Sequence, residues 1–321
     1  MHGHHARFLI FALSLVACAS QDGRRGTPKP LRAPATRFSV DATFALAVIE
    51  GNYDRRALLN SPAMAAILRH RKMTGAPTDN PGGVLDKMMG RIKNPSGAAK
   101  VLQYWRGRHA KLVRCAFAAR RHIPDRVSLD GKIILAAGYD IGVASPPDIV
   151  LNVAHPHFVA APAELCHYVT HEVHHVGFLA LRKIPDVSSA LRTRKALMSL
   201  IRFMTQMEGT AVHAAYGPRK TAGALGADAD YRVYRDQRHA EQVRRDYAIA
   251  LRRLERAEVE GKFNQSLAGE VLTTLSSKDR LWYRYGALVA RELEQTSGRR
   301  ALVLSIRQPE PFYLMAAKLL P

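Results

Sequence analysis

The chain has 321 residues, 47% of them hydrophobic, which excludes wholesale disorder and allows one large domain or two smaller lobes. Its formal net charge is +21, with basic residues spread along the whole sequence. No zinc finger, RNP aromatic pair or KH loop accompanies this charge, so no nucleic-acid partner is predicted. Attraction to anionic lipid headgroups or envelope polymers fits the charge better.

The N-terminal segment has the order of charged and apolar residues that is typical of an export signal. Arg7 precedes a run of apolar or small residues, 8–17, which is too short to span a bilayer. The run ends in Leu15-Val16-Ala17-Cys18, which resembles the lipobox of bacterial lipoproteins. The resemblance implies a signal peptide over residues 1–17 and lipidation of Cys18. An ordinary signal peptide, cut after Cys18 or Ser20, is the alternative.

No other stretch approaches the ~18 apolar residues that a membrane-spanning helix needs. We therefore expect a protein of the bacterial cell envelope that is held to a membrane by its lipid anchor and faces the periplasm or the exterior. After Cys18, the segment to residue 37 is rich in Pro, Gly and charge, which predicts a flexible tether. The folded domain is expected to cover residues 38–321.

The first part of this domain, residues 38–122, is predicted to be helical. Asp41 opens a helix that runs to Glu50 and stops at Gly51. Asn60 or Ser61 followed by Pro62 opens a second helix, which ends before Gly75. Two further helices are expected, a short one over 85–89 inside a loop and a longer one over 98–121.

The pattern then changes, because residues 126–138 and 147–155 are β-branched runs bounded by Gly and Pro, which indicates strands. From Pro162 onward nearly everything is predicted to be helical, over 163–183, 188–216, 228–260 and 278–297. The fold class is therefore α+β and mostly helical, with one small sheet. We divide the rest of the domain into a core, 123–216, and a helical C-terminal part, 217–321.

The helix over 163–183 contains His171-Glu172-Val173-His174-His175. At 3.6 residues per turn His171 and His175 lie on one face, so both imidazoles reach one cation about 2 Å from each nitrogen. Glu172, about 100° around the helix, lies beside that cation without binding it. There it can take a proton from water and pass it to a leaving amine. The pattern predicts the zinc site of a hydrolase, although five residues of this kind also occur by chance.

Zinc needs a third protein ligand, and Glu208 on the next long helix is the candidate. The spacing allows that helix to return antiparallel to the first. Gly209 is costly inside a helix unless another segment approaches closely, so we expect a tight helix contact beside Glu208. The alternative is a surface glutamate followed by a break in the helix.

The two motifs together resemble the glutamate-ligand (gluzincin) class of zinc peptidases and, more narrowly, zinc-dependent peptidase families of bacterial envelopes. The resemblance covers about 38–321 and implies a zincin-like active-site helix beside a small sheet, followed by a helical C-terminal part. It implies one Zn²⁺ per chain with His171, His175 and Glu208 as ligands and Glu172 as general base. It also implies an edge strand over this helix that pairs with an extended substrate, for which 148–154 is the candidate.

The sequence departs from thermolysin-like members of the class at one position. They carry an acidic residue four positions after the third ligand, where this chain has Val212. Asp148 or His213 is therefore expected to orient a zinc histidine instead. The class also uses a Tyr or His to stabilise the oxyanion, and Tyr283 is favoured over Tyr285 because the family pattern is Tyr-x-x-Gly. Both tyrosines could instead be packing residues.

Other histidines and two cysteines near this motif have alternative interpretations. A shifted site that uses His167 and His171 would lack a well-placed base, and His174 is expected to pack. His155 and His157 either line the cleft or have no role. Cys115 and Cys166 form either a disulfide or two buried thiols.

These observations predict a zinc metallopeptidase that hydrolyses peptide bonds with metal-activated water and Glu172 as base and then acid. The expected substrate is a peptide or an envelope protein segment, and the amide bonds of peptidoglycan cross-links are a second possibility. The alternative function is a non-catalytic zincin-fold envelope lipoprotein that acts as a binding or scaffold module. Glu172 argues against it, since a scaffold does not need the base. A basic envelope-binding protein with a coincidental motif is the third hypothesis.

Overall fold

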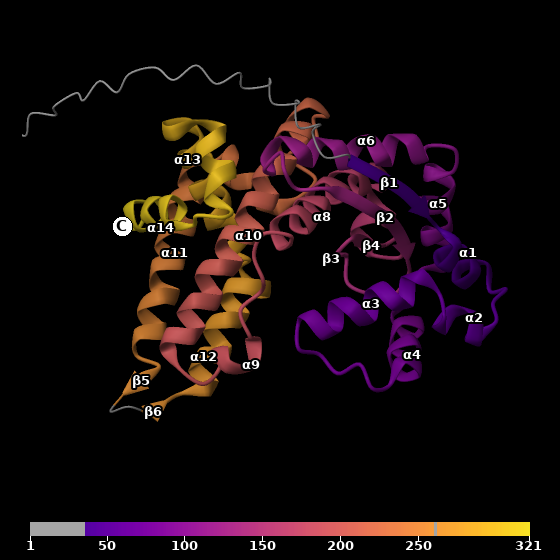
Figure 1. The fold of residues 1–321 in the computed structure, drawn as a ribbon, viewed down its shortest axis with the longest axis horizontal. Helices are drawn as coiled ribbons and strands as arrows, with labels where there is room; N and C mark the ends of the chain where they lie inside the picture. The colour runs from indigo at the N-terminus through magenta and orange to yellow at the C-terminus, as the bar shows by residue number, and fades with distance from the viewer. Residues whose placement is uncertain (1–35, 260–261) are drawn as a thin grey trace, which may run out of the picture. The chain divides into compact units, whose positions relative to one another are not determined.

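The computed structural model of the chain describes residues 36–259 and 262–321. The predicted signal peptide, Cys18 and nearly all of the predicted tether lie outside these residues. The described part is mostly helical and contains one four-stranded sheet, which confirms the predicted α+β class (Figure 1). None of its helices combines the length and the apolar character needed to cross a membrane.

The sheet has the strand order β1-β2-β4-β3, where the strands are β1 (Thr36–Asp41), β2 (Leu129–Ala136), β3 (Gly142–Ser145) and β4 (Asp148–Asn152). Strands β1, β2 and β4 are parallel, and β3 pairs antiparallel with β4. The prediction of an edge strand over 148–154 is therefore wrong. The chain first forms the short strand β3, then turns back, and β4 inserts between β3 and β2. The edge strand is β3.

Both faces of this sheet are covered. In β2 and β4 the consecutive residues 133–136 and 149–151 are buried, as expected for strands packed on both sides. The helices α3 (Pro62–Met73) and α8 (Leu165–Leu179) each contact β2, β3 and β4, so they must occupy opposite faces (Figure 1). The helix with the histidine motif is thus fixed against the small sheet.

The N-terminal helices differ from the prediction mainly where a glycine interrupts them. A single helix over 98–121 is wrong, because Gly107 has a left-handed φ of 73° and separates two helices. The predicted start at Pro62 is confirmed, with Ser61 Oγ accepting a hydrogen bond from the Met64 N–H at 3.2 Å. The other helices of this part are α1 (Thr43–Glu50), α2 (Arg55–Leu59), α4 (Pro81–Arg91), α5 (Pro95–Trp105) and α6 (His109–Ala119).

A disulfide joins α6 to α8. Cys115 and Cys166 are bridged, with their Cα atoms 5.5 Å apart, which decides between the two states that the sequence left open. One turn further along α8, the Thr170 hydroxyl donates to the Cys115 carbonyl at 2.9 Å. The short helix α7 (Pro156–Ala160) and the 3-10 turn η2 (Pro162–Glu164) lead into α8. These contacts fix α8 against α6.

The C-terminal part consists of helices with a second hydrophobic core of its own. In α13 the predicted break at Gly298 is confirmed, since this residue has a left-handed φ of 82°. The α12 and α14 helices were not predicted. The elements are α9 (Val187–Ala190), α10 (Arg194–Thr221), η3 (Ala229–Tyr234), α11 (Gln237–Glu255), β5 (Glu258–Val259), β6 (Lys262–Phe263), α12 (Gln265–Thr273), η4 (Thr274–Lys278), α13 (Leu281–Ser305) and α14 (Glu310–Lys318).

The helices α10 and α13 cross at two glycines. A Cβ atom at Gly209 would lie 2.1 Å from the Gly286 carbonyl carbon, and one at Gly286 would lie 2.1 Å from the Thr205 oxygen. Only glycine fits at either position, so the predicted tight contact beside Glu208 is confirmed. This crossing fixes the position of α10 along the axis of α13, and it therefore fixes where Glu208 lies.

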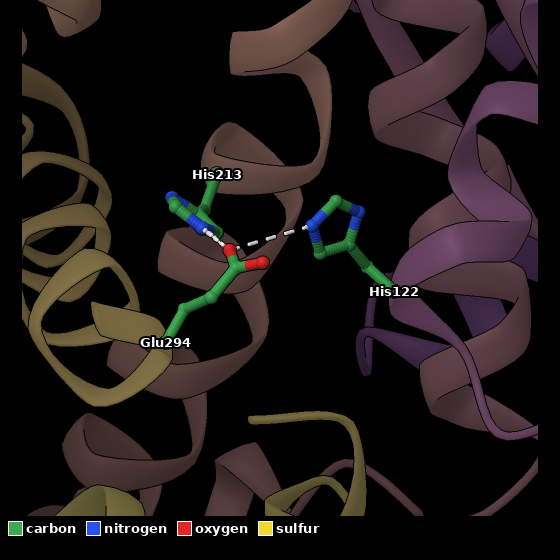
Figure 2. Close-up of side chains that lie close together, drawn as sticks. All are labelled: His122, His213 and Glu294. Carbon is green, nitrogen blue, oxygen red and sulfur yellow. Dashed lines mark hydrogen bonds and ion pairs between the residues drawn. The ribbon is translucent and has the colours of Figure 1, made fainter. Parts of the chain in front are cut away.

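The two halves also meet at the end of α6. The 3-10 turn η1 (Arg120–His122) brings His122 to His213 on α10 and Glu294 on α13 (Figure 2). The next residue, Ile123, fills the space left by Gly177, where a Cβ atom would lie 2.5 Å from its side chain. The connection from α6 to β2 is thereby packed against α8, α10 and α13 at once.

Candidate metal centre and active-site cleft

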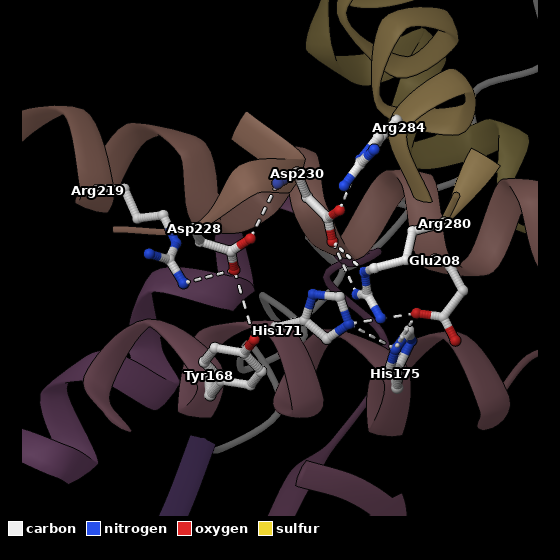
Figure 3. A network of polar contacts seen from close by, with 9 residues as sticks. All are labelled: Tyr168, His171, His175, Glu208, Arg219, Asp228, Asp230, Arg280 and Arg284. Carbon is white, nitrogen blue, oxygen red and sulfur yellow. Dashed lines mark hydrogen bonds and ion pairs between the residues drawn. The ribbon is translucent and has the colours of Figure 1, made fainter. Parts of the chain in front are cut away.

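The structure brings His171, His175 and Glu208 together (Figure 3). His171 Nε2 and His175 Nε2 are 3.0 Å apart, and they lie 3.3 and 3.1 Å from one oxygen of Glu208. The two histidines project from one face of α8, one turn apart, as the spacing predicts. All three side chains are almost buried, with exposed fractions of 13, 7 and 8%.

The helices that carry these residues run antiparallel, as predicted, and a second ion pair fixes their register. Glu164 at the start of α8 accepts a hydrogen bond from Arg219 near the end of α10. His175 lies eleven residues further along α8 and Glu208 eleven residues further back along α10. Because the two helices run in opposite directions and both residues lie eleven positions from the Glu164–Arg219 pair, His175 and Glu208 face each other.

The donor set fits a zinc ion. Two imidazoles and a carboxylate are a common set of zinc ligands, and bonds of about 2.1 Å in a tetrahedron separate ligand atoms by about 3.4 Å. The three separations of 3.0 to 3.3 Å are close to this value. Nitrogen lone pairs and a carboxylate oxygen repel one another at such distances unless positive charge lies between them. The cluster is therefore suited to a cation.

The electrostatics of the cluster also demand positive charge. Burial would raise the pKa of Glu208, but His175 and His171 lower this pKa far below its usual range, so the carboxylate is ionised. Burial would lower the pKa of His175, but Glu208 and Glu172 raise it instead. Two buried carboxylates thus act on the same pair of imidazoles, and a divalent ion would balance them.

Glu172 lies between the histidines and the edge strand β3. Its side chain reaches Gly142, where a Cβ atom would lie 2.9 Å from Glu172 Oε1, so a larger residue there would displace the carboxylate. Burial raises the pKa of Glu172, while His175, His171 and the Ala144 backbone hydrogen bond partly oppose that rise. A raised carboxyl pKa suits a group that must take up a proton near neutral pH.

A cavity of about 600 Å³ opens over this cluster. One wall is the segment from Tyr139 to Ala144, which includes β3, and the other is built by α10, η3 and the start of α13. Among the residues predicted for the site, it is lined by His171, Glu172, His175, Glu208 and Tyr283. The cleft therefore lies beside β3, the strand at the edge of the sheet, where an extended peptide could add to the sheet.

The two candidate tyrosines are separated by the structure. Tyr283 lines the cavity and stacks on His171, with ring centroids 6.5 Å apart and planes 19° apart. Tyr285 is fully buried, stacks on Tyr247 and donates its hydroxyl to the Ala316 carbonyl. Burial raises the pKa of Tyr283 far above its usual range, so its hydroxyl keeps its proton. Tyr285 is a packing residue, whereas Tyr283 lines the cavity with a protonated hydroxyl that is able to donate a hydrogen bond.

Sequence reasoning missed the ion network of Asp230, Arg280 and Arg284 beside the cleft (Figure 3). Asp230 is 2% exposed and accepts hydrogen bonds from Arg280 Nε at 2.8 Å and Arg284 Nε at 3.0 Å. The Arg280 guanidinium lies 3.7 Å over the Tyr283 ring, and its backbone is in the left-handed region, with φ 48°. Such a conformation is costly outside glycine. No local sequence signal marks these pairs, because their members come from different elements.

The predicted partners for the zinc histidines are wrong. Asp148 accepts hydrogen bonds from Arg69 Nη2 at 2.6 Å and the Lys132 N–H at 2.8 Å, and His213 belongs to the cluster with His122 and Glu294. In the described part of the chain, His175 Nδ1 is buried and has no hydrogen-bond partner. Both side chains are therefore engaged with other partners, although His213 lies on the same helix as Glu208.

The remaining histidines behave differently from the cluster. His167 is buried away from the cavity, where burial lowers its pKa to about 4, and Glu208 pairs with His175 instead. His174 is fully buried against Phe178, which agrees with a packing role. His155 lines the cavity, whereas His157 contacts Glu164 at 3.3 Å.

One family shares its sequence pattern with most of the chain. The pattern of the family described as "Putative zinc dependent peptidase (DUF5700)" matches residues 92–317. The matched range contains the histidine motif, Glu208 and Tyr283. No match was found among curated proteins or among solved structures.

Proposed function

The chain belongs to this family, whose description is a zinc-dependent peptidase, and we propose that it hydrolyses peptide bonds with a zinc ion held by His171, His175 and Glu208. The observation that carries the proposal is the convergence of these three side chains beside Glu172 and the β3 edge. When bound there, zinc supplies a Lewis acid that makes a water molecule nucleophilic.

The residues around the cluster then position the substrate, transfer the proton and stabilise the developing charge. An extended substrate pairs with the outer edge of β3, which positions one peptide bond over α8. Glu172 accepts a proton from the attacking water and delivers it to the leaving amine. Tyr283 donates a hydrogen bond to the oxygen of the carbonyl group as negative charge develops there. Arg280 and Asp230 hold the Tyr283 ring in place.

The substrate that we propose is a peptide or an extended segment of an envelope protein. We also propose that Cys18 carries the lipid that anchors the enzyme to a membrane. Palmitate labelling that persists in a Cys18→Ser variant would contradict the anchor without affecting the proposed chemistry.

Peptide cleavage tests the proposed function. The full chain is incubated with a mixture of unlabelled peptides, and new termini are identified by mass spectrometry. We expect cleavage that a zinc chelator abolishes and that added zinc restores, because the cluster needs the metal to act. Cleavage that continues unchanged in the chelator, after zinc loss has been verified by elemental analysis, would rule the mechanism out.

Removal of the Tyr283 hydroxyl is expected to lower kcat. A Tyr283→Phe variant should lose about 100-fold in kcat with little change in KM, which is the usual cost of one oxyanion donor. Tyr285→Phe is the matched control, because it removes a buried hydrogen bond and should cost about 1 kcal/mol of stability without changing kcat. Equal kcat for Tyr283→Phe and wild type would remove Tyr283 from the mechanism.

A further inference from the structure

A second group of metal-binding side chains lies outside the cleft. His122 on η1, His213 on α10 and Glu294 on α13 converge from three elements (Figure 2). His213 Nε2 is 2.5 Å from Glu294 Oε2, and His122 Nε2 is 3.8 Å from the same oxygen. The ligand atoms of all three lie within 4.8 Å of one another. Two imidazoles and one carboxylate again make up the set.

The side chains around His213 fix the orientation of its ring. Its Nδ1 lies 2.9 Å from the Tyr234 hydroxyl, and that hydroxyl also lies 3.4 Å from the Ala287 carbonyl oxygen. Its Nε2 faces Glu294 Oε2 at 2.5 Å. Either a proton or a metal ion can therefore lie between this nitrogen and the carboxylate.

His122 adds a second imidazole that faces the same oxygen. The ring is nearly enclosed, with a side-chain exposure of 13%, and its Nε2 is the nitrogen on the side of Glu294. Its Nδ1 is buried and, among the described residues, has no hydrogen-bond partner. One proton could satisfy His213 and Glu294 alone, whereas a divalent cation satisfies all three groups.

The side chains behind the cluster hold two of the three groups in position. His213 is held by Tyr234, whose ring stacks on it with centroids 6.0 Å apart. Glu294 accepts a second hydrogen bond at its other oxygen, from Arg299 Nε at 2.9 Å. Metal ligands are commonly oriented in this way by outer partners. To bind one cation together with both imidazoles, Glu294 Oε2 would have to move away from His213 and toward His122.

We propose that His122, His213 and Glu294 form a second divalent-cation site, of the zinc class, that is separate from the cleft. The three groups border a cavity of about 760 Å³, which leaves a fourth position open to water or a small ligand. Arg121, Arg291 and Arg299 line the same cavity and favour an anionic group, such as a carboxylate, in that position.

The role that the geometry assigns to this site is structural. The cation would join η1 to α10 and α13, and the residue after His122 packs against Gly177 of α8. The site would therefore hold α8 and α10 in the relative position that the first site needs. Removing it should lower the melting temperature even when the cleft histidines are intact, because a ligand that binds only the folded state stabilises that state.

Zinc content measured on five forms of the full chain tests the proposal. Each form is incubated with zinc, and unbound metal is removed by gel filtration. The number of bound zinc ions per chain is then measured by elemental mass spectrometry. We expect about two zinc ions per chain in the wild type, about one in Glu294→Gln, about one in His175→Ala, and background in the double variant. Glu292→Gln, on the same helix, is the matched control and should keep both ions.

A thermal melt separates metal loss from misfolding. Added zinc should raise the melting temperature of His175→Ala, in which only the second site is left, and should not raise that of the double variant. One zinc in the wild type that disappears in His175→Ala and persists in Glu294→Gln would overturn the second site and leave the peptidase proposal standing. If the wild type instead holds one zinc ion that is lost in Glu294→Gln and kept in His175→Ala, the first site is overturned and the second stands.

Discussion

Replacement of His175 by alanine is expected to remove zinc from the cleft and to reduce peptide cleavage to background. His175 Nε2 lies 3.0 Å from His171 Nε2 and 3.1 Å from Glu208, so it completes the three-sided set. Loss of a side chain that merely orients a zinc ligand costs up to about 100-fold in affinity, so loss of a ligand itself should cost more. Zinc affinity, measured by competition with a chromogenic chelator, and peptide cleavage check this result.

His167→Ala is the matched control. It removes a buried histidine from the same helix, two turns earlier and away from the cavity. We expect this variant to keep its cleft zinc affinity and its activity once its fold has been verified by circular dichroism. Loss of cleft zinc in His167→Ala with retention in His175→Ala would instead favour the shifted pair, His167 and His171.

The second large effect is expected for Glu172→Gln. The amide has nearly the shape of the carboxylate but cannot accept the proton, so kcat should fall by about 10² to 10⁴-fold while zinc binding stays unchanged. Burial already raises the pKa of Glu172, which shows that its surroundings tolerate a neutral group there. Steady-state kinetics and metal content are measured on the same preparation.

Asp140→Asn is the control for this substitution, because Asp140 is an exposed carboxylate that lines the same cavity. It should leave kcat within a few fold of the wild type, as is usual for substitutions at the surface. A Glu172→Gln variant that retains zinc and full activity would show that another group moves the proton.

The helix motif and its third ligand could be predicted from sequence because their geometry is local. The spacing of His171 and His175 fixes their common face on any helix, and Gly209 marked the close approach of another backbone beside Glu208. The break at Gly298 was likewise visible as a glycine at a helix end. In each case one or two residues determine the local backbone.

Strand order could not be predicted in this way. The segment 148–154 has the composition of a strand, but its place inside the sheet depends on β1 and β2, far away in sequence. The four-residue strand β3 is too short to stand out, although the two prolines after Ser145 mark the turn that follows it. Whether a strand lies at the edge or in the centre of a sheet depends on the strands with which it pairs, and its composition does not determine that pairing.

Residues that act through partners on other elements were also missed. Asp230 and Arg280 meet across 50 residues, and His213 and Glu294 across 81. No periodicity links such pairs, so only the packing of α13 against η3 and α10 reveals them. For the same reason Asp148 and His213 were assigned as partners of the zinc histidines, from which the fold separates them.

The central claim is that His171, His175 and Glu208 hold a zinc ion beside Glu172. Anomalous diffraction at the zinc absorption edge, from crystals of the zinc-loaded full chain, tests it most directly. If the proposed site binds zinc, an anomalous peak is expected about 2 Å from the Nε2 atoms of both histidines and from a Glu208 oxygen. A zinc-loaded crystal with no peak within bonding distance of these atoms would contradict it.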